Sequence, residues 1–285
     1  MSERKEIRIS TSLINQMFPD GEEKSLCPRQ LKTGYIDRKY RMPETEAMSA
    51  GRFFEYLCLG SGANPDDNVT DLRSVKSGKG GEKSVDQVRI EDQVRQFETL
   101  VEQLGCKITP ENTQQHVGRE WEHDYNEWSD DYEVLITGVL DFISPVNAIG
   151  FKENGERYPL IFDEAVIDLK LTKDIWGTFG RNRSWAYPWT MSHTQLAIYN
   201  YITGLPAMYW VFDYKTKPEF RLYYKELTSI EQLEMHETIR KTVEAYISMN
   251  KLGWPASPAF YRCRQCPFKE EDCADRTKRP DIQIF

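Results

Sequence analysis

The order of hydrophobic and polar residues predicts several helices. Between Val85 and Leu104 the apolar residues recur every three or four positions among charges, as in an amphipathic helix that packs on a sheet. Met48 to Gly60 predicts a short, largely buried helix that ends at the glycine. Two later segments have the same helical spacing, and they are Trp189 to Thr203 and Ser229 to Lys251.

Other segments are rich in β-branched and aromatic residues and predict strands. They are His116 to His123, Tyr132 to Ser144, Tyr158 to Leu171, Ala207 to Tyr214, and Glu219 to Lys225. The connection between the second and third contains Pro, Asn, Gly and Lys, which indicates a hairpin or meander. The order of helices and strands predicts an α/β fold with a central mixed sheet flanked by helices.

The length of the chain suits one large core. Its 285 residues, 39% of them hydrophobic, lead us to predict a single domain over residues 1–285. The segment Ser61 to Ser84 is rich in small and polar residues and lacks apolar periodicity. We therefore expect a flexible loop or a surface insertion at 61–84.

Charge limits the way in which this chain can hold a polyanion. A net charge of −8 excludes a protein coated in basic surface, so nucleic acid would need a local groove lined with Lys and Arg. One basic and aromatic segment contains Arg181, Arg183, Trp185 and Trp189. It suits the stacking and charge of single-stranded DNA, but a surface loop with packing aromatic residues explains it as well.

The ends and the apolar segments indicate the compartment. The sequence begins MSERKEIRIS, without the apolar region of a signal peptide, and no stretch approaches the roughly 20 apolar residues of a membrane span. We expect a cytoplasmic protein with no membrane partner, in a bacterial or phage-infected host cell. In that reducing compartment, clustered cysteines favour a metal over disulfides.

Asp168 and Lys170 form the first candidate for chemistry. Strand alternation places both on one face of the predicted third strand, with Ile167 and Leu169 on the other. A carboxylate there can bind a divalent cation, and an ammonium group beside it can orient water or neutralise a phosphate oxygen. A surface ion pair is the alternative, but the apolar run around Asp168 indicates a buried carboxylate that needs a partner.

Asp141 lies at the end of another apolar run. If the second and third predicted strands pair, its carboxylate comes close to Asp168 and could be a second metal ligand. In a buried helix, Glu55 follows Phe53 and Phe54, and it is read either as a third oxygen ligand or as an ordinary helix carboxylate.

These residues resemble the PD-(D/E)XK nucleases, and within them the RecB-type branch that includes CRISPR-adaptation nucleases and exonuclease V. The resemblance covers most of the chain. It rests on Gly138 to Asp141, on Asp168 to Lys170, and on Gln195 to Tyr199, in the order that the branch has. The branch often has Gly-x-x-x-His in its first helix, whereas Gly51 to Glu55 ends in glutamate here.

The resemblance implies a restriction-endonuclease-like core and a nuclease mechanism. Glu55, Asp141, Asp168 and the carbonyl of Leu169 would hold Mg²⁺ or Mn²⁺, and Lys170 would position the nucleophile or stabilise developing charge. Gln195 would orient catalytic groups or contact a phosphate, and Tyr199 would face the DNA. The spacing of these two residues also fits an ordinary amphipathic helix.

Four of the six cysteines form a second candidate site. Cys263, Cys266 and Cys273 lie close together in a C-terminal segment at 260–285, and Cys27 stands near the N-terminus. Four thiolates can hold a metal centre that joins the two ends of the chain. The resemblance implies a 4Fe-4S cluster, structural Zn²⁺ is the alternative, and Cys58 and Cys106 are expected in the core.

We therefore predict a metal-dependent deoxyribonuclease, with exonuclease action favoured over endonuclease action. The expected substrate is DNA with single-stranded ends or overhangs, in recombination, repair, or the processing of phage or mobile-element DNA. Without a Walker A motif, unwinding would need a helicase, recombinase or single-strand-binding partner. The alternatives are a noncatalytic DNA-binding or scaffold subunit and a zinc-bound structural protein.

Overall fold

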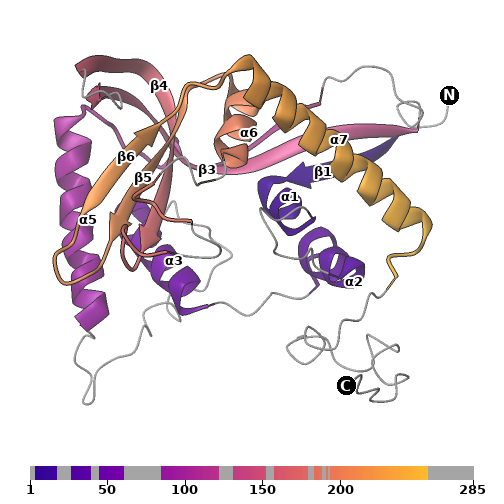
Figure 1. Cartoon of the computed structure of the whole chain (residues 1–285), viewed down its shortest axis with the longest axis horizontal. Coiled ribbons are helices and arrows are strands. Elements are labelled where there is room, and N and C mark those ends of the chain that lie inside the picture. The colour runs from indigo at the N-terminus through magenta and orange to yellow at the C-terminus, as the bar shows by residue number, and fades with distance from the viewer. Residues whose placement is uncertain are drawn as a thin grey trace. The chain divides into compact units, whose positions relative to one another are not determined.

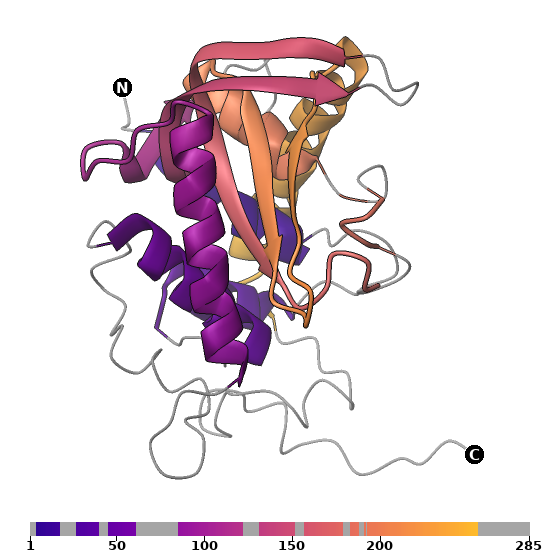
Figure 2. The ribbon, with the colours of Figure 1, turned by 90° about the vertical axis from the view of Figure 1, so that its left-hand side faces the viewer.

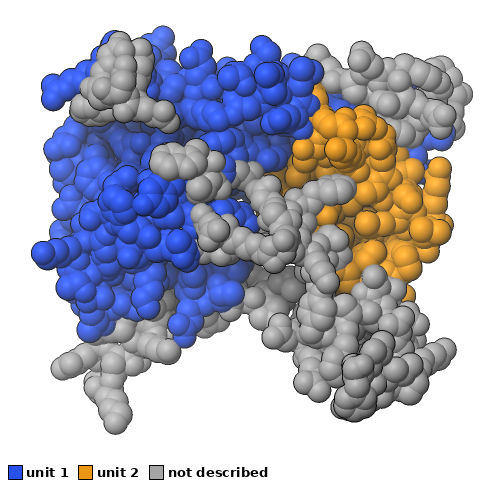
Figure 3. All heavy atoms as spheres, viewed as in Figure 1, with its two compact units in different colours: residues 1–8, 44–235 blue, residues 9–43, 236–285 orange. Residues whose placement is uncertain are grey.

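The computed structural model describes residues 4–17, 27–39, 45–60, 85–121, 131–151, 157–178, 183–187, 191 and 193–255. By its internal contacts the chain divides into two compact units, residues 1–8 with 44–235 and residues 9–43 with 236–285 (Figure 3). The single domain stays a prediction. The predicted insertion at 61–84 and the cysteine segment at 260–285 lie outside the described residues.

A mixed sheet forms the centre of the first unit (Figure 1). Its hydrogen-bonded order is β1-β3-β4-β5-β6, with β2 paired to β3; β4 and β5 are parallel, and the pairs β2–β3, β3–β4 and β5–β6 are antiparallel. The strands are β1 Lys5–Ser10, β2 Thr113–Glu120, β3 Tyr132–Phe151, β4 Arg157–Thr172, β5 Ala207–Asp213 and β6 Phe220–Tyr224. The predicted meander of β2, β3 and β4 is confirmed.

Helices cover both faces of this sheet. One face packs against α3 (Glu46–Leu59) and α5 (Val85–Gln103), which stands in front of the sheet in Figure 2. The other face packs against α6 (Thr194–Thr203). The predicted fold class, a mixed sheet flanked by helices, is confirmed.

An aromatic cluster fixes α3 and α5 on their face of the sheet. The ring of Phe54 in α3 lies 6.4 Å from Phe97 in α5 and 5.0 Å from Phe212 in β5. The ring of Phe97 in turn makes edge contacts with Phe142 and Trp210 at 6.1 and 6.0 Å. Such rings interlock in few arrangements, so α3 and the residues along it take a defined place on the sheet.

The strand β3 continues seven residues past the predicted end at Ser144, to Phe151. The predicted end was wrong, because pairing with β4 continues beyond Pro145 through a shift of register between Ser144 and Val146. A bulge accommodates a proline, which has no N–H for the ladder.

Short helices and one long helix make up the described part of the second unit. They are α1 Thr11–Met17, α2 Pro28–Leu31, the π-helical turn η1 Lys32–Ile36, and α7 Ser229–Lys251 from His236 onward. The first strand and α1 were not predicted, and α7 has the predicted bounds. No helix in the described ranges has both the length and the apolar character needed to cross a membrane.

Candidate active site

Asp168 and Lys170 lie on the face of β4 that α6 covers. Asp168 is 1% exposed, and its Oδ2 forms an ion pair with the Lys170 ammonium group. Ile167 and Leu169 point into the opposite core, with the aromatic rings of α3 and α5. The alternation predicted from the sequence is therefore confirmed, and the carboxylate is buried rather than part of a surface pair.

Asp141 lies beside Asp168 on the neighbouring strand. The antiparallel register pairs Phe142 with Ile167, so the adjacent position sets Asp141 opposite Asp168. The Leu169 N–H donates to Asp141 Oδ2 at 2.6 Å. An aspartate side chain of β3 thus binds the backbone of β4 within the Asp-x-Lys motif, and this holds the two carboxylates side by side.

Gln195 and Tyr199 bring the helix α6 to the same point. Gln195 Nε2 donates to Asp168 Oδ1 and to the Tyr199 hydroxyl, both at 2.8 Å. The Tyr199 hydroxyl donates to the Val139 carbonyl at 2.9 Å. The structure therefore brings together the three sequence motifs, and a chain of hydrogen bonds connects them.

Gly138 is the position where the tyrosine approaches β3. A Cβ built on Gly138 would lie 3.0 Å from Tyr199 Cε1, which is closer than ordinary packing, and 3.4 Å from Cδ1. The glycine that begins the Gly-x-x-Asp motif therefore leaves space for the Tyr199 ring, which is 3% exposed.

Gln114 is a site residue that sequence reasoning missed. Its side-chain amide donates to the Glu55 carboxylate of α3, and its φ of +48° is rare for a residue with a side chain. The register of β2 and β3 passes from Thr113–Phe142 to Gln115–Leu140, which sets Gln114 opposite Asp141. Gln115 follows directly in a polar segment, so no pattern in the sequence distinguishes Gln114.

Burial and mutual repulsion control the charges of the carboxylates. Burial, the Asp168 charge and the Glu55 charge raise the pKa of Asp141 well above its usual value, against the opposing effect of Lys170. Burial also raises the pKa of Asp168, although Lys170 partly offsets it. Burial alone would lower the pKa of Lys170, but the charges of Asp168 and Asp141 outweigh it and raise that pKa.

The donor chemistry of this site fits a hard divalent cation. Asp141 and Asp168 are adjacent carboxylates, half-buried and buried respectively, and Glu55 is close enough for its charge to act on Asp141. A cation would relieve the repulsion that raises the pKa of Asp141. Among the described residues, no three His, Cys, Asp or Glu side chains already stand together as a metal site. The Leu169 N–H and the Gln195 amide donate to the two aspartates. The ligand set of Glu55, Asp141, Asp168 and the Leu169 carbonyl stays a prediction.

The cysteine site falls largely outside the described residues. Cys27 is half-buried and directly precedes α2, whereas Cys263, Cys266 and Cys273 are not described. Cys106 is buried in the core, and Cys58 packs against that core, as predicted. Burial raises the pKa of the Cys106 thiol to about 11, which keeps it protonated.

Trp185, in the basic and aromatic segment, packs inside the protein. Trp185 is 8% exposed, and its ring packs edge-on against Tyr209 at 5.3 Å and stacks beside Tyr223 at 6.2 Å. For Trp185 the alternative interpretation, a packing aromatic residue, is therefore correct. Arg181 and Trp189 lie outside the described residues.

One solved crystal structure is similar to this chain in fold. It is that of a protein from Eubacterium rectale named "Putative exonuclease". The fold is shared. The TM-score is 0.57 at 16% sequence identity, over 97% of this chain and 90% of that chain. No protein-family model matches the chain, and no curated protein matches it.

Proposed function

We propose that this protein is a metal-dependent deoxyribonuclease that hydrolyses phosphodiester bonds, with exonuclease action favoured. The observation that carries the proposal is the gathering of Asp141, Asp168 and Lys170 on neighbouring strands. Gln195 of α6 donates to Asp168, and Tyr199 holds Gln195. Adjacent carboxylates, one of them buried, beside a lysine suit metal-assisted phosphoryl chemistry. The fold shared with the Eubacterium rectale protein supports the same proposal.

Each residue has a role that follows from its contacts. Asp141 and Asp168 would hold Mg²⁺ or Mn²⁺, together with Glu55 and the Leu169 carbonyl. A bound cation would supply activated water and neutralise charge on the phosphate. Lys170, ion-paired with Asp168, would donate to a phosphate oxygen or orient the attacking water.

Gln195 and Tyr199 act on the position of Asp168. Gln195 holds one carboxylate oxygen of Asp168, and Tyr199 holds Gln195 while it binds the backbone of β3. The resemblance implies that Gln195 orients catalytic groups or contacts a phosphate and that Tyr199 faces the DNA. Tyr199 is buried here, so we propose that it positions Gln195 instead.

The proposed substrate is DNA with single-stranded ends or overhangs, in recombination, repair or the processing of phage or mobile-element DNA. A helicase, recombinase or single-strand-binding protein would supply such ends. The alternative function is a DNA-binding or scaffold subunit that retains the nuclease fold without cutting.

The test uses end-labelled single- and double-stranded DNA with Mg²⁺, with Mn²⁺, or with a chelator. We expect the wild type to release short products only with metal, and Asp168→Asn to lower the rate by more than about 100-fold because the metal ligand is lost. The matched control is Asp163→Asn, since Asp163 is an exposed aspartate of the same strand. It should cut at the wild-type rate.

Thermal unfolding of all three proteins separates loss of activity from loss of fold. A folded wild type that binds metal and DNA but never cuts would overturn the enzymatic proposal and leave the binding subunit. Equal activity of Asp168→Asn and wild type would exclude this site as the nuclease centre.

A further inference from the structure

Trp176 is an exposed tryptophan that lies close in sequence to Asp168 and Lys170 of the candidate active site. It follows β4, the strand of Asp168 and Lys170, and it is 49% exposed. The other tryptophans in the described part of the chain are at most 8% exposed, and they are Trp121, Trp185, Trp210 and Trp254. Tryptophan is highly buried on average, so an exposed one held by other contacts is a candidate for ligand contact.

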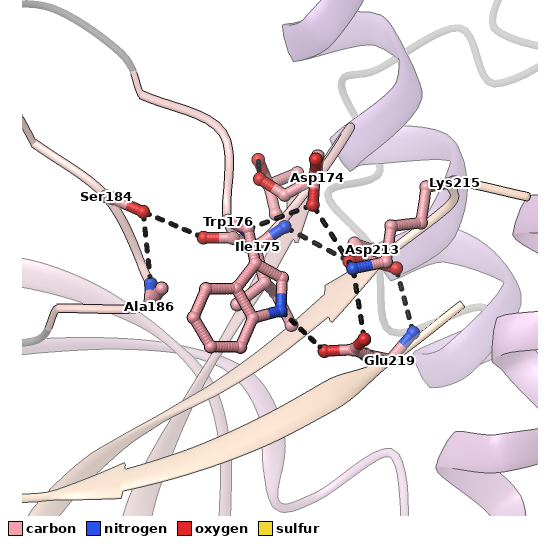
Figure 4. A network of polar contacts seen from close by, with 9 residues as sticks. Asp174, Ile175, Trp176, Ser184, Ala186, Asp213, Lys215 and Glu219 are labelled. Atoms are coloured by element: carbon pink, nitrogen blue, oxygen red, sulfur yellow. Dashed lines mark hydrogen bonds and ion pairs between the residues drawn. The ribbon is translucent and has the colours of Figure 1, made fainter. Parts of the chain in front are cut away.

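Polar contacts hold this exposed ring in place (Figure 4). Its indole N–H donates to Glu219 Oε2 at 2.9 Å, and its backbone N–H donates to Asp174 Oδ1 at 3.0 Å. Lys215 joins the frame through ion pairs with Asp174 and Glu219, both at 3.2 Å, and with the buried Asp213 at 3.3 Å. The ring is therefore prepositioned, which lowers the entropy lost when a flat ligand stacks on it.

Two further side chains extend the surface of Trp176. The Arg221 guanidinium lies 4.6 Å from the indole ring, and the ring of Tyr187, itself 45% exposed, meets the indole edge-on at 6.5 Å. We call these three residues, Trp176, Tyr187 and Arg221, the Trp176 platform. Exposed aromatic rings beside an arginine are the usual means of binding unpaired bases.

Packing contacts connect the platform with the catalytic face of the sheet. Ile175 and Trp185, neighbours of the platform residues in the chain, belong to the core that contains Tyr199 and Tyr209. The Trp185 ring packs on Tyr209, and the Lys170 ammonium group lies 5.6 Å from the same Tyr209 ring. The platform segment thus packs on the face of the sheet that carries Asp168 and Lys170.

The lysine beside the platform is not available for phosphate contacts. The carboxylates of Asp174, Asp213 and Glu219 surround Lys215, so this lysine is already paired. A lysine that is already paired contributes little to phosphate binding, so Arg221 is the basic group of the platform. Stacking uses the π-face that every base has.

We propose that the Trp176 platform stacks unpaired bases of single-stranded DNA that leads to the carboxylates of β3 and β4. The proposal rests on the proposed function and names its substrate contact. It assigns to Trp176 the stacking role that the sequence suggested for the segment with Trp185 and Trp189.

The experiment measures binding without cleavage. The full chain carrying Asp168→Asn is titrated against a fluorescent oligothymidylate and against an oligonucleotide of the same length and charge with abasic sites. Adding Trp176→Ala should weaken binding of the oligothymidylate about tenfold, the usual loss when a base loses its aromatic partner. Binding of the abasic strand should stay within about twofold.

Phe220→Ala is the matched control. Phe220 is an exposed aromatic residue next to Glu219 and Arg221, but its ring packs on Phe212 in the opposite core. Its removal should leave binding of both strands unchanged. If Trp176→Ala gives no cooperative thermal transition, Trp176→Leu replaces it, because leucine keeps apolar bulk without a π-face.

The outcomes separate the two proposals. If Trp176→Ala weakens binding of both oligonucleotides equally, or of neither, the platform proposal is wrong. If the wild type cuts DNA and Trp176→Ala still binds oligothymidylate normally, the platform fails and the nuclease stands. If the wild type does not cut but binding is lost only on the strand with bases, the platform stands and the nuclease fails.

Discussion

At Gln114 the backbone takes a conformation that a side chain makes costly. Its φ of +48° lies in the left-handed region, which costs an ordinary residue about 1–2 kcal/mol. The position lies opposite Asp141, and its amide reaches Glu55 of α3. Strain of this kind is concentrated at functional sites, where the surrounding structure enforces it.

Two variants of Gln114 measure the free-energy cost of its positive φ separately from the loss of its amide. Gln114→Gly and Gln114→Ala both remove the amide, but only glycine adopts a positive φ without steric conflict. We expect the glycine variant to be more stable than the alanine variant by about 1 kcal/mol. Chemical denaturation measures the difference, and an alanine variant as stable as the glycine variant would contradict the strain.

Gly138 tests the contact between two motifs. In Gly138→Ala the new methyl group would meet the Tyr199 ring, which cannot yield easily because its hydroxyl is bonded to Val139 and Gln195. We expect a loss of about 1–3 kcal/mol in stability, as for other overpacked sites. Since Tyr199 holds Gln195, DNA cleavage should fall as well.

The control for Gly138 is a glycine of the neighbouring strand. Gly118→Ala should be mild, because a Cβ there has its closest contact at 3.5 Å. Thermal unfolding of the two variants gives the comparison. A Gly138→Ala protein with wild-type stability would show that Tyr199 can move away.

At the level of single elements, α7 shows how local chemistry starts a helix. Thr228 accepts the Glu231 N–H at 3.3 Å, and the Glu231 carboxylate accepts the Thr228 N–H at 3.0 Å, which is a capping box. The same carboxylate is ion-paired with Lys225 at the end of β6. The side-chain bonds to Lys225 and Thr228 lower the pKa of Glu231 to about 2.

This shift makes the start of α7 sensitive to acid. Because the folded pKa lies below that of the unfolded chain, the stabilisation is complete above about pH 4.5 and is lost as the pH falls towards 2. Glu231→Gln keeps an acceptor for Thr228 but loses the charge. At pH 7 it should be less stable than the wild type by about 0.5–1 kcal/mol.

Urea denaturation from pH 7 down to pH 3 measures this difference. The gap between Glu231→Gln and the wild type should narrow as the pH falls. A gap that stays constant would mean that the Lys225 pair adds no stability.

At the scale of the whole molecule, the four-cysteine centre stays a prediction that solution chemistry can test. Protein purified without oxygen should be brown, with iron and broad absorption near ~400 nm, if thiolates hold a 4Fe-4S cluster. Cys27→Ser should lower the iron content and the unfolding temperature, because metal binding contributes to folding. Cys106→Ser, in the core, should keep its iron.

The metal content distinguishes an iron-sulfur cluster from structural Zn²⁺ at the cysteine site. Colourless, zinc-loaded protein would replace the cluster with structural Zn²⁺ and leave the nuclease proposal intact. A protein without either metal would exclude the cysteine centre.

The sequence by itself determined most of the elements and the three motifs. The helical spacing of apolar residues in Val85 to Leu104 made α5 predictable, and the β-rich pattern of Tyr158 to Leu171 made β4 predictable. Both patterns reflect local geometry and burial. Asp141 and Asp168 could be paired in advance because a hairpin connects their strands. The start of α7 also follows from a local capping box.

Tertiary structure alone decided what long-range contacts control. The extension of β3 past Pro145 depends on pairing with β4, and the role of Gln114 depends on a helix 59 residues away in sequence. Trp176 and Trp185 look alike in sequence, but packing on Tyr209 buries one and a polar frame holds the other in water. Local pattern cannot distinguish them, because burial is a property of the assembled sheet and its covering helices.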